Sequence, residues 1–100
     1  FKVKKLSKYP QVRRDFSFII DNKILFVDLM NVVKQTSKLI KEIKLMDSYV
    51  GKPLKSNEKS YSFSVILEDI NKTLEDSEIN KISEKIIKET SKKFNAVLRS

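Results

Sequence analysis

Residues 47–65, DSYVGKPLKSNEKSYSFSV, contain the pattern that decides the fold. Apolar residues alternate with serines at the end of this stretch, which is typical of a strand with one buried face. The residues predicted to face the core are Tyr61, Phe63, Val65 and Leu67. The residues of opposite parity are Ser60, Ser62 and Ser64. Glycine, proline and asparagine within residues 51–57 indicate a long turn, so the stretch is predicted to be a β-hairpin.

The arm that precedes the turn alternates less cleanly. Met46 and Val50 are predicted to face the core, while Asp47 and Tyr49 face the other side. A carboxylate, a phenol and small hydroxyls then share the uncovered side of a sheet. Because the chain has a formal net charge of +8, this surface suits single-stranded nucleic acid.

Composition narrows the function further. The 100 residues make one domain, residues 1–100, of which 1–11 lead into the first strand. The chain begins with Phe1 instead of methionine, so we expect a fragment of a longer protein. Cysteine, histidine and tryptophan do not occur, which excludes a thiolate nucleophile and an imidazole base. We expect no catalytic residues, metal site or cofactor in this chain, and its short apolar runs indicate no membrane partner.

Hydrophobic periodicity along the rest of the chain predicts six elements. These are strands over 12–20, 41–50, 59–68 and 95–99, a helix over 25–38, and a second helix whose first turn lies within 73–78 and which ends near Lys92. The order β-α-β-β-α-β predicts an α+β, ferredoxin-like fold: a four-stranded antiparallel sheet with both helices on one face and the other face open. The open face is predicted to carry Asp15, Ser17, Ile19, Asp47, Tyr49, Ser60, Ser62, Ser64, Val97 and Arg99.

The basic residues admit two interpretations. Arginine binds phosphates and base edges bidentately, but only three of the 21 basic residues are arginines. Arg14 is interpreted as pairing with Asp15 at the start of the first strand, with RNA contact by Arg13 or Arg14 as the alternative. The lysines around the hairpin either attract phosphate or keep the protein in solution; they are Lys52, Lys55 and Lys59.

Five motifs in order resemble the C-terminal ferredoxin-fold anticodon-binding domain of phenylalanine–tRNA ligase β subunits. They are SKYP-x-VRRDFSF (7–18), LMD-x-Y-x-G (45–51), KS (59–60), TL-x-D-x-EI (73–79) and A-x-LR (96–99). The resemblance spans essentially the whole chain. Two positions depart from the family pattern: Glu75 replaces the usual threonine or serine helix cap, which predicts a helix start shifted by a residue, and Ser48 replaces a small apolar residue.

The resemblance implies a noncatalytic module that recognises the anticodon loop of phenylalanine tRNA, especially its first base, a guanine. Tyr49 resembles the aromatic residue that stacks on that base, and Asp47 and Ser60 resemble the polar pair bonded to it. Arg99 resembles the basic residue near the loop. Further candidate RNA contacts are Arg14 and Lys59.

The resemblance also implies a parent enzyme, a cytoplasmic aminoacyl-tRNA ligase that attaches phenylalanine using ATP and Mg²⁺. The implied partners are the anticodon stem-loop of phenylalanine tRNA and the other domains and α subunit of the ligase. A bacterial heterotetramer and a single-chain organellar enzyme both remain open as parents; composition favours the bacterial one.

Two alternatives use the same fold. A ferredoxin-like protein-interaction module would have an open face dominated by apolar residues, whereas aspartate, serine and tyrosine dominate the predicted one. A general RNA-binding module without tRNA specificity would tolerate Asp47→Asn, whereas a guanine reader would lose discrimination.

Overall fold

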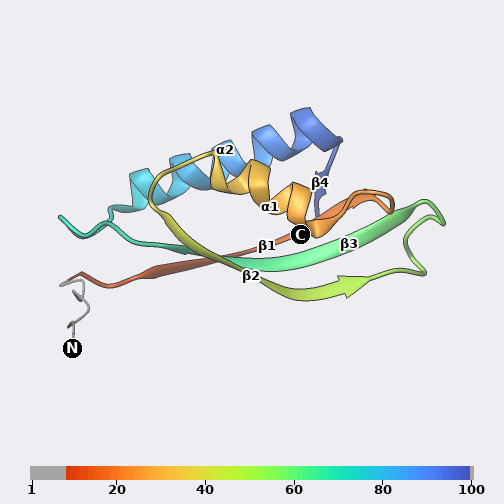
Figure 1. Cartoon of the computed structure of the whole chain (residues 1–100), viewed down its shortest axis with the longest axis horizontal. Helices are drawn as coiled ribbons and strands as arrows, with labels where there is room; N and C mark the ends of the chain where they lie inside the picture. The colour runs from red at the N-terminus through yellow and green to blue at the C-terminus, as the bar shows by residue number, and fades with distance from the viewer. Residues whose placement is uncertain (1–8, 100) are drawn as a thin grey trace.

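The computed structural model in Figure 1 describes residues 9–99 of the chain. The elements in chain order are β1 (Val12–Asp21), α1 (Phe26–Lys34), β2 (Ile40–Tyr49), β3 (Glu58–Leu67), α2 (Asp76–Phe94) and β4 (Val97–Leu98). This order confirms the predicted β-α-β-β-α-β fold. Most of the predicted leading segment, residues 1–8, lies outside the described residues.

All four strands form one antiparallel sheet in the order β2-β3-β1-β4. Both helices lie on the same side of this sheet, and no helix covers the other side within residues 9–99 (Figure 1). This uncovered side is called the open face below. Its existence was the central structural expectation from the sequence, and it is confirmed.

The hydrophobic core fills the space between the sheet and the helices. The apolar residues of β3 that were predicted to face inward are all buried: Tyr61, Phe63, Val65 and Leu67. Phe63 lies 5.8 Å from both Phe16 and Phe18, measured between ring centroids. Phe26 of α1 meets the ring of Phe63 edge-on, also at 5.8 Å. Burial of these rings supplies much of the free energy that fixes the sheet against the helices.

Helix α1 ends at Lys34, four residues before the predicted end. The Thr36 hydroxyl donates to the Val33 carbonyl at 2.7 Å, and the Leu39 N–H donates to the Ser37 hydroxyl at 3.1 Å. Such local hydrogen bonds to side chains satisfy backbone N–H and carbonyl groups without further helical turns. The predicted last strand is also shorter, because only Val97 and Leu98 pair with β1.

Helix α2 begins at Asp76, directly after the N-cap residue Glu75, so the atypical cap residue does not displace the helix start. Glu78 accepts hydrogen bonds from the Lys72 ammonium at 2.9 Å and from the Glu75 N–H at 3.3 Å. Lys72 first and the backbone N–H second hold the pKa of the Glu78 carboxyl below its ordinary value. Asn95, in the left-handed region with φ 55°, ends the helix and turns the chain into β4.

Strand β2 contains two irregularities, and the second decides what faces the open side. Leu45 pairs with Phe63 and Asp47 with Ser62, so Met46 is an extra residue in a β-bulge. Strict alternation from Leu45 would place Asp47 and Tyr49 beneath the helices; the bulge places them on the open face instead. The prediction that Met46 and Val50 face the core is wrong, since their exposed fractions are 57% and 65%.

Candidate nucleic-acid interface

The strand register places the predicted site residues on the open face. Tyr49 pairs with Ser60 across β2 and β3, and Ser60 pairs with Ile19 across β3 and β1. The neighbouring row contains Asp47, Ser62 and Ser17. Because side chains directly opposite each other in a sheet lie on the same face, these two rows form one surface.

Tyr49 and Arg99 meet above the open face although they come from opposite edges of the sheet. The Arg99 N–H donates to the Ser17 carbonyl at 2.7 Å, which extends the pairing of β4 with β1 by one residue. The Arg99 guanidinium carbon then lies 5.9 Å from the centroid of the Tyr49 ring. Since β2 and β4 lie three strand spacings apart, about 14 Å, the two side chains must extend toward each other across β3 and β1. This contact is a cation–π interaction.

A second contact fixes the Tyr49 ring at the base of the hairpin. Its hydroxyl donates to the carbonyl of Lys52, in the turn that joins β2 to β3. Gly51 within this turn has φ 111°, a backbone conformation that favours glycine. The turn therefore holds the phenol group, while the face of the ring contacts Arg99.

Ser60 faces the open side but is only 2% exposed. Its hydroxyl lies 3.4 Å from that of Ser17, which in turn lies 2.9 Å from that of Ser62. No helix covers this side, so the cover over Ser60 comes from its neighbours, and the Tyr49 and Arg99 side chains extend across this row. At this exposure the Ser60 hydroxyl is not accessible to a ligand in this conformation.

Asp47 differs from Ser60 in being accessible. Its side chain is exposed, and within residues 9–99 its carboxylate has no hydrogen bond or ion pair. It lies beside Ser62 on the open face. An unpaired carboxylate there can accept hydrogen bonds from an incoming base at no cost in broken protein contacts.

The predicted pairing of Arg14 with Asp15 is wrong. Asp15 accepts hydrogen bonds from Arg13 Nε at 2.9 Å and from the Ser64 hydroxyl at 2.6 Å. Adjacent residues of a strand point to opposite faces, so Arg14 cannot share the open face with Asp15, whereas Arg13 can. The Ser64 hydroxyl first, and Arg13 second, lower the pKa of the Asp15 carboxyl.

The lowered pKa predicts how the Asp15→Asn variant responds to pH. A carboxyl whose pKa is lower in the folded state stabilises the fold above its unfolded pKa of about 3.9, and this contribution disappears as the pH falls through the folded pKa. Urea titrations should therefore show Asp15→Asn less stable than the parent chain at pH 7. The gap should narrow near pH 2, and a gap independent of pH would contradict this account.

The two further candidate contacts do not lie with the main group. Arg14 has the parity of the buried residue Phe16, and its guanidinium donates to the Arg13 carbonyl at 3.0 Å. Lys59 has the parity of Tyr61, and its ammonium lies 4.7 Å from the centroid of that ring. Both therefore belong to the helix side of the sheet by parity.

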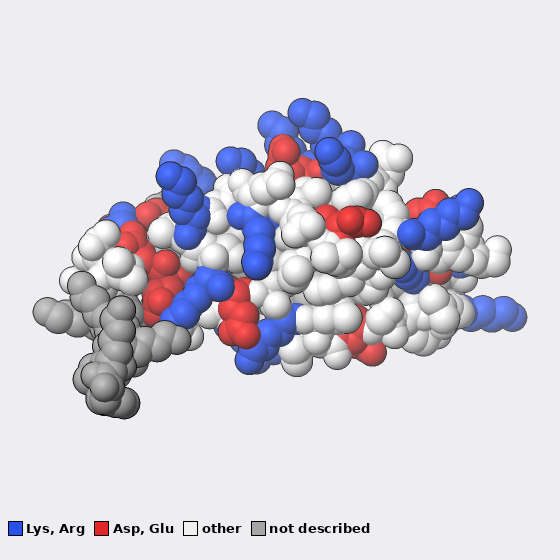
Figure 2. All heavy atoms as spheres, viewed as in Figure 1, with Lys and Arg blue, Asp and Glu red and all other residues white. Residues whose placement is uncertain are grey.

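Acidic residues outnumber basic residues on the open face, which the net charge of the chain did not indicate. Among the strand residues placed by register, and with Arg99 included, it has three basic residues, Arg13, Lys44 and Arg99, and five acidic residues, Asp15, Asp21, Glu42, Asp47 and Glu58. Figure 2 shows basic side chains along the helix side of the molecule, and others beside acidic side chains in the sheet half below. Affinity at the open face must therefore come from stacking and hydrogen bonds more than from net charge.

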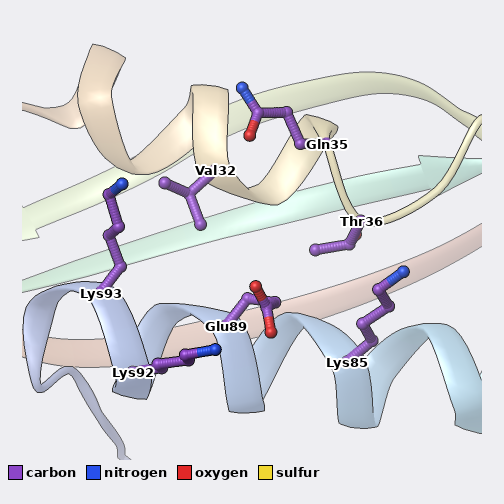
Figure 3. Close-up of a pocket in the computed structure, with 7 residues that line it drawn as sticks. All are labelled: Val32, Gln35, Thr36, Lys85, Glu89, Lys92 and Lys93. Atoms are coloured by element: carbon purple, nitrogen blue, oxygen red, sulfur yellow. The ribbon is translucent and has the colours of Figure 1, made fainter.

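A cleft of about 470 Å³ between the two helices holds part of this positive charge. In Figure 3, Lys92 and Lys93 of α2 lie across from α1, Lys85 lies near Thr36 after its C-terminal end, and Glu89 points into the space between the helices. Basic residues in the last turn of a helix also stabilise its negative end, which accounts for Lys92 and Lys93 without a ligand. None of the predicted site residues lines this cleft.

A groove of about 460 Å³ lies on the open face, and of the four main predicted RNA-binding residues only Arg99 lines it. Arg13 and Met46 line it together with Asp15, Ser17, Ser62 and Arg99. Met46 was assigned to the core, because the imperfect alternation of this arm did not reveal the bulge that exposes it. Arg13 has the same parity as Asp15, which was predicted to lie on the open face, so the sequence could have placed Arg13 there too.

Residues 9–99 contain no group of three or more acidic side chains arranged to hold a metal ion. Neither helix in this part of the chain has the length and hydrophobicity needed to span a bilayer.

Comparison with known proteins identifies the family to which this chain is similar. The model of the ferredoxin-fold anticodon binding domain matches residues 7–99. A phenylalanine–tRNA ligase beta subunit from Bacteroides fragilis is 40% identical over 97 residues, which cover 96% of this chain and 12% of the relative. Beta subunits from Legionella pneumophila strain Lens and Clostridium acetobutylicum are each 38% identical, over 96% and 98% of this chain and 12% of each relative. The chain thus spans about an eighth of the length of these relatives.

Proposed function

We propose that this chain, which belongs to the ferredoxin-fold anticodon binding domain family, binds the anticodon loop of phenylalanine tRNA through its open face. One observation supports this most. The open face carries Tyr49 and Asp47 from β2, Ser60 from β3 and Arg99 from the residue after β4, and Ser60 is buried among its neighbours there.

The proposed recognition uses each group differently. An unstacked base lies on the Tyr49 ring, a contact worth about 1–3 kcal/mol. The Asp47 carboxylate accepts hydrogen bonds from N1–H and the 2-amino group of guanine, a donor pair that adenine does not have. Ser60 bonds to the same base once it is uncovered. Arg99 leaves the ring of Tyr49 or stacks on the far side of the base, where its charge still faces the loop.

The proposed parent is a phenylalanine–tRNA ligase, because the matched relatives are its beta subunits. In that setting the module orients tRNA so that phenylalanine, activated with ATP and Mg²⁺ elsewhere in the enzyme, reaches the acceptor end. Other domains and the α subunit are then further partners, and the cytoplasm is the proposed location. The boundaries 1–100 as one anticodon-binding domain of a longer chain are part of this proposal.

Titration of the chain with an anticodon stem-loop of phenylalanine tRNA tests the proposed function. Changing the first anticodon base from guanine to adenine should weaken binding about tenfold or more, since hydrogen bonds to a charged group contribute about 1.5–3 kcal/mol. Asp47→Asn should reduce the difference between the two loops, while the parent chain keeps it.

The outcomes separate the alternatives. Equal affinity of the parent chain for both loops, together with an unaffected Asp47→Asn variant, would leave a general RNA-binding module. Absence of binding to either loop would contradict the proposed function altogether.

A further inference from the structure

The groove lined by Arg13, Met46 and Arg99 lies beside the Tyr49 row on the same open face. We infer that it is a second nucleotide site, which holds the nucleotide adjacent in the strand to the one over Tyr49. This inference rests on the proposed function and gives a role to Met46 and Arg13, to which the family resemblance assigned none. It assigns the base to Met46 and the serine row, and the phosphate to Arg13.

The spacing of the two rows fits neighbouring nucleotides. Ser60, in the Tyr49 row, and Ser62, in the groove, are two residues apart on β3 and face the same side. Two residues of a strand span about 7 Å, roughly twice the 3.4 Å spacing of stacked nucleotides along one strand. Two adjacent nucleotides that are splayed apart can therefore each occupy one row.

Size and chemistry of the groove also fit a nucleotide. Its volume of about 460 Å³ falls within the roughly 300–1,000 Å³ of small-molecule sites. Ser17 and Ser62 form a polar floor, their hydroxyls 2.9 Å apart. Met46 forms an apolar wall on the bulge, with 57% of its surface exposed. A thioether is polarizable and packs favourably on an aromatic ring.

Arg13 provides the charge for a phosphate. Its side chain is 57% exposed, and it uses Nε and one terminal nitrogen on the Asp15 carboxylate. Asp15 is also bonded to Ser64, so its position is fixed and it orients the guanidinium. The remaining N–H donors of Arg13 are free to bind an anion.

Strands β1 and β2 each provide a matched control on the opposite face. Leu45 precedes Met46, is 45% exposed and pairs with the core residue Phe63. Arg14 follows Arg13 and has the parity of the helix side. Each variant on the open face can therefore be compared with a similar variant on the helix side. Met46→Ala is compared with Leu45→Ala, and Arg13→Gln with Arg14→Gln.

The experiment titrates the chain and these variants with the anticodon stem-loop at several salt concentrations. Met46→Ala should weaken binding about twofold to tenfold, the range for a methionine–ring contact. The slope of log K against log salt is negative, and Arg13→Gln should reduce its magnitude by about 0.7, the value for one phosphate of a single strand. The Leu45 and Arg14 variants should bind like the parent chain.

Stem-loops with an abasic residue on either side of the first anticodon base locate the second base. With one of these two abasic loops, Met46→Ala should no longer weaken binding, while Tyr49→Ala should still weaken it. Binding that depends on Tyr49 but not on Met46 or Arg13 would overturn the second site alone, as would a Met46 effect that survives both abasic loops. Binding independent of Tyr49, or absent, would overturn both the second site and the proposed function.

Discussion

Replacing Tyr49 with alanine is expected to weaken binding of the anticodon stem-loop about 5- to 150-fold, the equivalent of the 1–3 kcal/mol that base stacking on an aromatic ring contributes. Tyr49 is 39% exposed and lies outside the core, so the variant should fold normally. Circular dichroism and a fluorescence titration of labelled RNA together measure the effect on binding separately from any effect on folding.

Tyr49→Phe is the matched control for this prediction. It keeps the ring that faces Arg99 and removes only the hydroxyl that donates to the Lys52 carbonyl. We expect an affinity much closer to that of the parent chain than to that of Tyr49→Ala. If phenylalanine were as damaging as alanine, the hydroxyl and its contact with the turn would be the important feature, and stacking would not be.

Phe63→Ala is expected to have the largest effect on stability, a loss of about 3–5 kcal/mol in the free energy of unfolding. Phe63 is 1% exposed and lies against the rings of Phe16, Phe18 and Phe26. Because small domains are stable by only about 5–15 kcal/mol, this variant should unfold at a much lower urea concentration than the parent chain. Equilibrium urea denaturation measures the difference.

Ile66→Ala provides the comparison on the other side of the same strand. Ile66 is half-buried and faces the open side, opposite Arg13 and Glu42. Its replacement should cost clearly less than that of Phe63, since within residues 9–99 no second layer packs on that face. Equal losses would contradict a core that lies on one side of the sheet only.

The sequence predicted the fold and the faces of β3 and β1 because their alternation is unbroken. Phe16, Phe18 and Ile20 pair regularly with β3, so counting residues in twos assigned each side chain to the correct face. The two helices were predictable from the spacing of their apolar residues. The early end of α1 did not, because it depends on hydroxyl bonds of Thr36 and Ser37 that compete with helical turns.

The sequence predicted which candidate residues lie on the open face better than it predicted their contacts. Asp47 and Tyr49 were assigned to the open face by parity with each other, but the bulge at Met46 that makes this possible was not visible in the sequence. The contact of Arg99 with Tyr49 joins opposite edges of the sheet, and no local pattern encodes such a contact. The burial of Ser60 on the side of the sheet without helices was equally hidden.

Amide chemical shifts recorded by NMR during titration with the anticodon stem-loop test most directly whether the open face binds RNA. We expect the largest changes at Tyr49, Ser60 and Arg99, with little change across the helix cleft around Val32 and Lys85. Changes concentrated in that cleft, with the open face unaffected, would contradict the account.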